Sequence, residues 1–332
     1  MGDTRRRWQL WEGTHRFFCD GRLMLARDFA IGLCSISFMS ALFLVWGVFV
    51  CPHLDTLTTL AAWLLYGVSM YLFAVVWTTD PGVIPSKRGH LTADEVVAFA
   101  AEERSCEVNG VVLPLKWCRT CHIFRPLRAS HCSTCDVCVE RFDHHCMWLG
   151  SCIGGRNYRL FVLFINSLCV LGSFVLGATG VATHRAMAVS SAHDAVCSNL
   201  PQMPRAVWAR QALCFVTRLT AYGPVHPVWF VVVLVFTFGV WVPFANYHLK
   251  LLMRNQTTYE YLKQAPPHSD VSNPFSRGAW HNTVEACCHP RPPSHLHSRA
   301  VLSEDERLRA ERVLAEKGAE KVPVLLANCK QD

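Results

Sequence analysis

Polar and apolar residues fall in long, separate blocks along this chain. Four runs without a charged residue cover residues 29–50, 57–79, 160–183 and 225–249. At about 1.5 Å per residue, a helix of this length crosses a bilayer core of about 30 Å. The pattern therefore predicts four transmembrane helices. Only the short segment Cys51–Asp55 joins the first two runs, so these should form an antiparallel helix hairpin.

The apolar runs divide the chain into five regions. We expect a juxtamembrane N-terminus over residues 1–28, helices 1 and 2 over 29–79, a polar cysteine-rich domain over 80–159, helices 3 and 4 over 160–249 with a loop over 184–224, and a tail over 250–332. The predicted fold class is an all-α polytopic membrane protein with the cysteine-rich domain between helices 2 and 3.

Helix signals outside and inside the apolar runs add detail. Thr92 and Glu95 form a capping box that should open a short helix through Arg104. Ser303 and Glu306 should open a charged helix that Gly318 ends. Pro243 is expected to kink the fourth transmembrane helix.

The distribution of Lys and Arg predicts the orientation. The N-terminus, region 80–159 and the tail carry nearly all of these cations, and the connection after the first helix carries none. Because cytoplasmic segments are enriched in Lys and Arg, we expect both termini and the cysteine-rich domain in the cytosol. The 184–224 loop should then be lumenal, where Cys197 and Cys214 could form a disulfide.

Composition narrows the class of protein. Hydrophobic residues make up 51% of the chain and charged residues 17%, which argues against a simple soluble protein. The net charge of +7 suits contact with anionic membrane lipids, and no motif suggests nucleic acid as a partner. Of the 17 cysteines, seven are clustered at metal-ligand spacing with histidines between them, which favours zinc in a reducing compartment over a disulfide scaffold.

The stretch Trp117–Cys152 concentrates this chemistry. It contains seven cysteines and four histidines, which are Cys118, Cys121, Cys132, Cys135, Cys138, Cys146, Cys152, His122, His131, His144 and His145. Two tetrahedral sites need eight ligands, so at least one Cys or His is spare. A spare thiol beside histidines is a candidate nucleophile.

The segment Asp143–Cys146 contains the groups that such a nucleophile needs. In an extended backbone, alternate side chains share a side, so His145 can face a metal while His144 and Cys146 point the other way together. Asp143 can accept the ring N–H of His144, which would make the three a nucleophile, a base and an orienting carboxylate. The alternative is that all of these residues are ligands in a zinc-binding interaction module.

An ordered set of short motifs resembles the DHHC protein S-acyltransferases, or palmitoyltransferases. The set comprises Asp80-Pro81-Gly82, the cysteine-rich segment with Asp143-His144-His145-Cys146, Thr257-Thr258-x-Glu260 and Asn273-Pro274-Phe275. The resemblance runs from the first apolar helix to about Phe275. Residues around Phe17–Arg22, Phe142 and Cys287-Cys288 are most similar to the Golgi branch that contains the Ras palmitoyltransferase.

The resemblance implies a role for each motif. It implies one zinc ion held by Cys118, Cys121, His131 and Cys138, and a second held by Cys132, Cys135, His145 and Cys152. Cys146 would be the acylated nucleophile, with His144 and Asp143 as its activating pair. Thr257, Thr258 and Glu260 would dock the tail against the catalytic domain, and Asn273 would orient structure near the helices. The family usually has Pro after the motif cysteine, where this chain has Met147, and we expect activity to survive.

The leading functional hypothesis is therefore an S-acyltransferase with two structural zinc ions and palmitoyl-CoA as co-substrate. The protein partners would be substrates with membrane-proximal cysteines and, as a possibility, an accessory subunit. The expected location is an endomembrane such as the Golgi or the ER. Basic residues that could bind the phosphates of coenzyme A are Lys116, Arg119, Arg125, Arg128, Arg156 and Arg159. A membrane-anchored zinc scaffold without turnover is the alternative function.

An acyl group on Cys146 must hide its apolar tail, since burial is worth about 0.8 kcal/mol per CH₂. The third apolar run begins only a few residues after the cysteine-rich segment, so the tail is expected to enter a cavity among the helices. The candidate lining residues are Trp148, Phe161, Phe164, Leu168 and Leu171. The alternative is that this face of the third helix packs against the fourth helix.

Overall fold

A computed structural model describes residues 6–189, 225–263, 273–296 and 302–316. Most of the predicted lumenal loop, with Cys197 and Cys214, and the helix end at Gly318 lie outside the described residues. The chain forms two compact units. Unit 1 comprises Met1–Ser35, Phe73–Val162 and His248–Asp332, and unit 2 comprises Ile36–Leu72 and Leu163–Tyr247.

Within the described residues, four helices are long and apolar enough to cross a membrane, as predicted. They are α1 (Phe29–Val50), α2 (Thr56–Thr78), α4 (Tyr158–Val189) and a fourth helix made of α7 (Val225–Leu234), a π-helix (Val235–Trp241) and α8 (Val242–Met253). A short 3₁₀ turn at Cys51–His53 joins the first two. The helix α4 runs past the predicted end of its apolar run because the next residues, His184–Val189, contain no Gly or Pro to stop it.

The irregularity of the fourth helix lies just ahead of Pro243. Proline lacks an N–H group and its ring crowds the carbonyl four residues earlier. The wider π-helix ends at Trp241, two residues before that ring. Thr237 in this segment is buried, and a Cβ atom built on Gly172 of α4 would lie 2.3 Å from its hydroxyl oxygen. The glycine therefore allows the two helices a close approach within unit 2.

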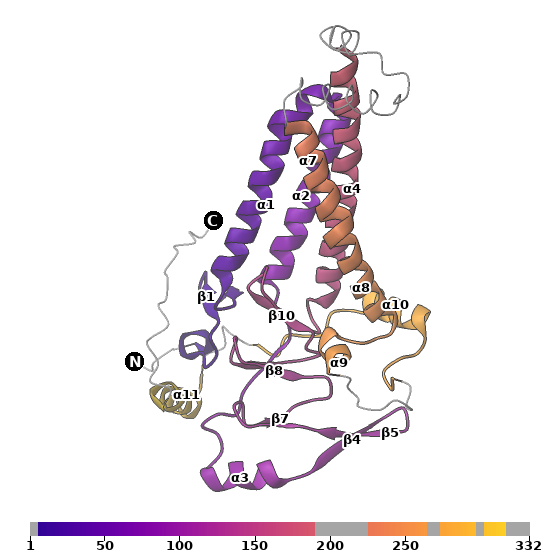
Figure 1. The fold of residues 1–332 in the computed structure, drawn as a ribbon. Coiled ribbons are helices and arrows are strands. Elements are labelled where there is room, and N and C mark those ends of the chain that lie inside the picture. Colours follow the sequence, from indigo (N-terminus) through magenta and orange to yellow (C-terminus); the bar gives the residue numbers. More distant parts are fainter. Residues whose placement is uncertain (1–5, 190–224, 264–272, 297–301, 317–332) are drawn as a thin grey trace. The chain divides into compact units, whose positions relative to one another are not determined.

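Unit 2 is held together by side chains from its helices, which Figure 1 shows side by side. Phe43 of α1 stacks on Tyr66 of α2 with ring centroids 4.2 Å apart. The buried indole of Trp46 donates a 2.9 Å hydrogen bond to the Thr179 hydroxyl of α4. The same apolar cluster includes Val50, Ala62, Val175, Ala178 and Ala182. The Trp46–Thr179 hydrogen bond satisfies two polar groups inside this cluster, and buried polar groups need such partners where water does not reach them.

The cysteine-rich part of unit 1 is built from short antiparallel strands. These are β3 (Val83–Ile84), β4 (Arg104–Val108), β5 (Val111–Leu115), β6 (Trp117–Cys118), β7 (Ile123–Phe124), β8 (Ser130–Cys132), β9 (Val137–Val139), β10 (His144–Cys146) and β11 (Ser151–Ile153). The pairs are β4–β5, β6–β7 and β10–β11, and β9 lies between β3 and β8. Most of these strands have two or three residues, which is too short for a two-residue period to predict. Figure 1 shows β7 and the β4–β5 hairpin beside α3 (Ala93–Ala101), where Phe99 packs against Trp117 and Phe124.

Two predicted helix starts are present, and one predicted end was wrong. Thr92 and Glu95 cap α3, and Ser303 and Glu306 cap α11 (Glu304–Glu316), each with reciprocal hydrogen bonds. The helix α3 ends at Ala101 rather than at Arg104, because Arg104 already pairs with Leu115 in the β4–β5 hairpin. The remaining elements of unit 1 are a 3₁₀ turn (Arg7–Leu10), β1 (Arg16–Phe18), β2 (Leu23–Leu25), α9 (Thr258–Leu262) and α10 (Ala279–Cys288).

Candidate active site and metal centres

The first group of metal-ligating side chains, here called cluster A, comprises Cys118, Cys121, His131 and Cys138. The turn of the β6–β7 hairpin supplies the first two, and the paired strands β8 and β9 supply the others, with His131 directly opposite Cys138. The ligand atoms lie within 4.8 Å of one another, and the three cysteines are buried. Short hairpins bring the two halves of the site together from both sides.

The second group, cluster B, comprises Cys132, Cys135, His145 and Cys152. The turn between β8 and β9 supplies Cys132 and Cys135. The paired strands β10 and β11 supply His145 and Cys152, which lie directly opposite each other. Clusters A and B contain the same two sets of four residues that the family resemblance implied. The ligands of the two sites therefore alternate along the sequence, as expected.

The donor geometry of both clusters fits zinc. Zinc bonds of about 2.3 Å to sulfur and about 2.0–2.1 Å to nitrogen, in a tetrahedron, place neighbouring sulfur and nitrogen ligands about 3.5 Å apart. The sulfur of Cys121 lies 3.4 Å from Nδ1 of His131. The three sulfurs of cluster B lie 3.4–3.6 Å from Nδ1 of His145. Each cluster therefore presents three sulfurs and one Nδ1 nitrogen around a point that a zinc ion would fill.

The strand β10 carries the predicted nucleophile and base on the side opposite cluster B. Because side chains alternate along a strand, His145 faces the metal ligands while His144 and Cys146 face the other way. Nδ1 of His144 lies 2.6 Å from Oδ2 of the fully buried Asp143. Cys146 neighbours His144 closely enough that its thiol helps to raise the pKa of the imidazole. The three side chains thus follow one another in the order carboxylate, imidazole, thiol.

The electrostatics of this group favour a protonated histidine. Burial by itself lowers the pKa of His144, but its hydrogen bond with Asp143 and the neighbouring Cys146 thiol outweigh burial and raise the pKa to about 9. Burial would raise the pKa of the Asp143 carboxyl, yet the hydrogen bond with His144 and the backbone N–H of Thr258 hold that pKa below its usual range. His144 can therefore keep the proton that a cysteine thiol loses, and Asp143 stabilises the resulting imidazolium.

Two aromatic side chains pack against the ring of His144. Phe161, on the first turns of α4, meets it edge to face with centroids 5.4 Å apart. The imidazole of His248, on α8, lies 6.0 Å from it and 5.0 Å from the Phe161 ring. His248 is buried, and sequence reasoning missed it because nothing local marks a histidine 104 residues away as a neighbour of His144.

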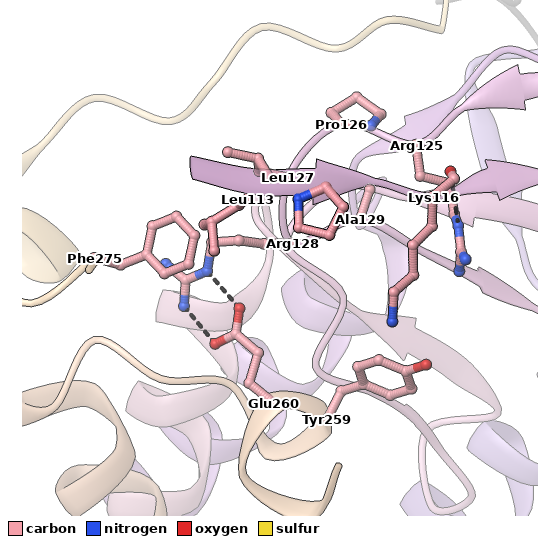
Figure 2. A pocket seen from close by; sticks show the side chains of 11 residues that line it. Leu113, Lys116, Arg125, Pro126, Leu127, Arg128, Ala129, Tyr259, Glu260 and Phe275 are labelled. Atoms are coloured by element: carbon pink, nitrogen blue, oxygen red, sulfur yellow. Dashed lines mark hydrogen bonds and ion pairs between the residues drawn. The ribbon is translucent and has the colours of Figure 1, made fainter. Parts of the chain in front are cut away.

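The Thr-Thr-x-Glu motif docks α9 onto the catalytic segment. Thr257 caps the helix, and the backbone N–H of Thr258 donates a 2.7 Å hydrogen bond to Oδ1 of Asp143. The carboxylate of Glu260 accepts two hydrogen bonds from Arg128, at 2.6 and 2.8 Å, as Figure 2 shows. Both side chains of this ion pair are about nine-tenths buried. The motif thus supplies a hydrogen bond to Asp143 and an ion pair with Arg128 that holds α9 in place.

The other two motifs hold the frame around the site. In Asp80-Pro81-Gly82, the Asp80 carboxylate accepts the N–H groups of Gly82 and Val83 at 2.9 Å and pairs with Arg156 at 2.8 Å. This turn places β3 next to β9. The Asn273 side chain donates to the carbonyl of Arg254 at 2.7 Å, just past α8.

The predicted cavity residues occupy different environments. Phe161, Phe164 and Leu168 are buried, whereas Trp148 is 65% exposed in the short connection between β10 and β11. Leu171 packs against the apolar cluster of unit 2. Met147, which stands where the family usually has Pro, is exposed beside Trp148. Whether these residues meet an acyl chain stays a prediction.

Charged neighbours of the metal clusters were also missed by sequence reasoning. Arg88 is buried, and its guanidinium bonds both carboxylate oxygens of Asp136 at 2.8 and 2.9 Å and lies 3.4 Å from the Cys121 sulfur. Asp28, just before α1, lies beside His145. No spacing rule links these residues to the cysteine pairs, so the sequence held no signal for them.

Comparison with known proteins agrees with this geometry. Residues 112–265 match the family described as DHHC palmitoyltransferase. Palmitoyltransferase ZDHHC18-B of Danio rerio is 32% identical over 96% of this chain and 81% of its own length. Palmitoyltransferase ZDHHC9 of Pongo abelii is 35% identical over 91% of this chain and 81% of its own length. Palmitoyltransferase ZDHHC14 of Danio rerio is 35% identical, and the match spans 91% of this chain and 62% of that protein.

The matched region contains both metal clusters and the predicted triad. The alignments to these relatives extend well beyond it and cover nearly the whole chain. On this evidence the chain belongs to the DHHC palmitoyltransferase family.

Proposed function

We propose that this membrane protein is a protein S-palmitoyltransferase in which Cys146 is the acylated nucleophile. The observation that carries the proposal is the group at β10, where His144 and Cys146 share one side of the strand, Asp143 just before the strand binds His144, and His145 joins cluster B. Cys146 belongs to neither metal cluster, so its thiol is left for chemistry.

The reaction has two thioester exchanges. In the first, the sulfur of Cys146 attacks the thioester carbonyl of an acyl-CoA, His144 takes the thiol proton, and that proton passes to the departing coenzyme A thiolate. In the second, a substrate cysteine gives its proton to His144 and attacks the acyl-Cys146 carbonyl, and the Cys146 thiolate leaves. Asp143 orients the imidazole in both steps. Each step replaces one thioester by another, so little net driving force is needed.

Acyl-CoA is the proposed co-substrate, and a basic pocket in unit 1 suits its phosphates. A cavity of about 160 Å³ is lined by Lys116, Arg125 and Arg128 together with the Tyr259 and Phe275 rings. Figure 2 shows the Lys116 side chain extending toward Tyr259, while Arg128 is engaged by Glu260. Lys116 and Arg125 are therefore the cations best placed to take a phosphate there.

The acyl chain is proposed to enter a cavity among the helices near Phe161, Phe164 and Leu168. These side chains share a face of α4 at spacings of three and four residues and are buried. Sixteen-carbon chains should fit well, and eighteen-carbon chains should be tolerated. Leu171 would close the far end.

Two zinc ions are proposed to hold the catalytic domain together, one in cluster A and one in cluster B. When bound, each ion would cross-link short hairpins that come from different parts of the segment. Because β10 carries both a cluster B ligand and the catalytic pair, loss of the metal from cluster B should also disorder the catalytic residues.

The proposed setting is an endomembrane, Golgi or ER, with both termini and the cysteine-rich domain in the cytosol. The excess of Lys and Arg in these segments supports that orientation, and cytosolic thiols stay reduced for zinc. The proposed protein partners are substrates with cysteines close to the membrane, because the nucleophile lies only 12 residues before the start of α4.

One experiment tests the function. Purified protein is incubated with labelled palmitoyl-CoA, then treated with neutral hydroxylamine, which cleaves thioesters. Label should attach to the wild type, be released by hydroxylamine, and be absent from Cys146→Ser. A zinc scaffold without turnover would acquire no such label in either protein, and label that persists in Cys146→Ser would place the acyl group elsewhere.

A further inference from the structure

Both ligand histidines turn the same nitrogen toward their cysteines and the same nitrogen toward a carboxylate. Nδ1 faces the sulfurs in each cluster. On the other side of the ring, Nε2 of His131 lies 3.7 Å from Asp136 in cluster A, and Nε2 of His145 lies 3.7 Å from Asp28 in cluster B. The two carboxylates come from unrelated segments of the chain, so the repetition points to a shared role.

The two carboxylates differ in what else holds them. Asp136 is bound by the buried guanidinium of Arg88, which compensates its charge. Asp28 sits just before α1, outside the region 112–265 that matches the family. Its side chain is 35% exposed and lies beside His145. Among the described residues no Lys or Arg pairs with Asp28, so its substitution isolates the effect on the histidine.

The backbone keeps Asp28 against the β10–β11 hairpin. Gly150, at a φ of +59°, passes so close that a Cβ atom there would lie 2.1 Å from the carbonyl oxygen of Asp28. That carbonyl accepts the N–H of Ile31 at 2.9 Å, at the start of α1. The position of Asp28 beside His145 is thus determined by the tight turn and by the first turn of a long helix.

We propose that Asp28 is a positioning residue for the metal ligand His145. For Nδ1 to offer its lone pair to a metal, the neutral ring must carry its proton on Nε2, and a carboxylate beside Nε2 favours that tautomer and raises ligand basicity. The 3.7 Å separation is longer than a direct hydrogen bond and short enough for one bridging water, and the carboxylate charge favours the N–H dipole at Nε2. The start of α1 is in this way coupled to cluster B, and through His145 to the strand that carries Cys146. The inference rests on the proposed zinc occupancy.

The test compares how fast each cluster loses its metal. Full-length wild-type and Asp28→Asn proteins in detergent are challenged with EDTA, and thiols released over time are alkylated with iodoacetamide and located by mass spectrometry. Asparagine can still cap the start of a helix, so α1 should be unaffected. The cysteines that report on cluster B are Cys132, Cys135 and Cys152, and those that report on cluster A are Cys118, Cys121 and Cys138.

Loss of a carboxylate partner of a ligand histidine typically weakens metal binding by about 10- to 100-fold. In Asp28→Asn we expect the cluster B cysteines to be alkylated about 10-fold faster than in the wild type, with cluster A unchanged. Asp136→Asn should show the reverse pattern. Asp94→Asn makes the same charge change on the exposed first turn of α3 and should alter neither cluster.

Two results would overturn the role of Asp28. In the first, the cluster B cysteines of Asp28→Asn are alkylated no faster than those of the wild type. In the second, alkylation is accelerated equally at both clusters, which would indicate a general loss of stability. Elemental analysis of the untreated wild type separates this inference from its premise. Fewer than two zinc ions per chain would refute the proposed zinc occupancy itself, whereas two ions with an unaltered cluster B in Asp28→Asn would refute only the role of Asp28.

Discussion

Glu260→Gln should detach α9 from the cysteine-rich domain and slow catalysis without touching the reacting atoms. The wild-type carboxylate is about nine-tenths buried and makes two kinds of contact. It pairs bidentately with Arg128 at 2.6 and 2.8 Å, and it accepts the Thr257 N–H at 2.9 Å. Glutamine keeps the shape and one acceptor oxygen but removes the charge that the buried guanidinium needs.

The cost can be worked from these contacts. Removing one partner of a buried ion pair costs about 3–5 kcal/mol. Gln can still accept one hydrogen bond, and Asn255 continues to accept from Arg128 at 2.9 Å, so about 2–3 kcal/mol is expected here. At about 2–4 °C per kcal/mol for a unit of this size, the melting temperature should fall by about 4–12 °C. Loosening α9 also weakens the Thr258 bond to Asp143, a charged hydrogen bond worth about 1.5–3 kcal/mol, so Cys146 acylation should slow by about 10- to 100-fold.

The chain contains a matched control. Thr92 and Glu95 form the same capping box at the start of α3, with the same reciprocal bonds, but on the surface and with no arginine partner in the described part of the chain. Glu95→Gln should therefore lose only an exposed cap, about 0.5–1 kcal/mol. The difference between the two variants measures the buried ion pair alone.

Thermal unfolding in detergent and acylation by labelled palmitoyl-CoA are the assays. In the double variant Arg128→Gln/Glu260→Gln, the uncompensated charge is gone, so its destabilisation should be smaller than the sum of the two single variants by about 1–3 kcal/mol. The reasoning is refuted if Glu260→Gln melts within a degree of Glu95→Gln, or if the two single effects simply add.

Four further outcomes are expected. Gly150→Ala should lower the melting temperature by the equivalent of about 1–3 kcal/mol, because its Cβ would collide with the Asp28 carbonyl; unchanged melting would contradict this. His248→Ala should slow Cys146 acylation and His248→Phe should restore part of the rate, because the ring packs beside His144; equal rates in the two variants would argue against a packing role. Leu171→Trp should shift preference from C16 toward C14 chains in competition between acyl-CoAs, and an unaltered preference with acylation intact would exclude Leu171 from the cavity. Protease added outside sealed vesicles of cytosolic orientation should cleave near α11, and protection of that helix would reverse the proposed topology.

The sequence by itself determined the features that depend on neighbours along the chain. The absence of charge over about 20 residues predicted α1 and α2 almost residue for residue, because a bilayer demands continuous apolar length. The two-residue alternation of an extended strand predicted that His144 and Cys146 would face away from His145. The number and spacing of the cysteines and histidines indicated two tetrahedral sites, since both can be read from neighbouring positions in the sequence. Which cysteine belonged to which site came from the family resemblance, and the structure has the same two sets.

Only the tertiary structure decided the features that join distant segments. Arg128 and Glu260 are 132 residues apart in the sequence. The contacts of Asp143 with Thr258 and of His144 with His248 also join residues more than 100 positions apart. No period or spacing encodes such a pair, because the path of the chain between the partners sets their distance. The strands of the cysteine-rich domain could not be predicted either. Most of them have only two or three residues and carry no measurable period, and the pairing of these short strands depends on the convergence of ligands at clusters A and B. Asp28 illustrates the same limit, because an aspartate ahead of an apolar helix looks like an ordinary helix start until the fold places it beside His145.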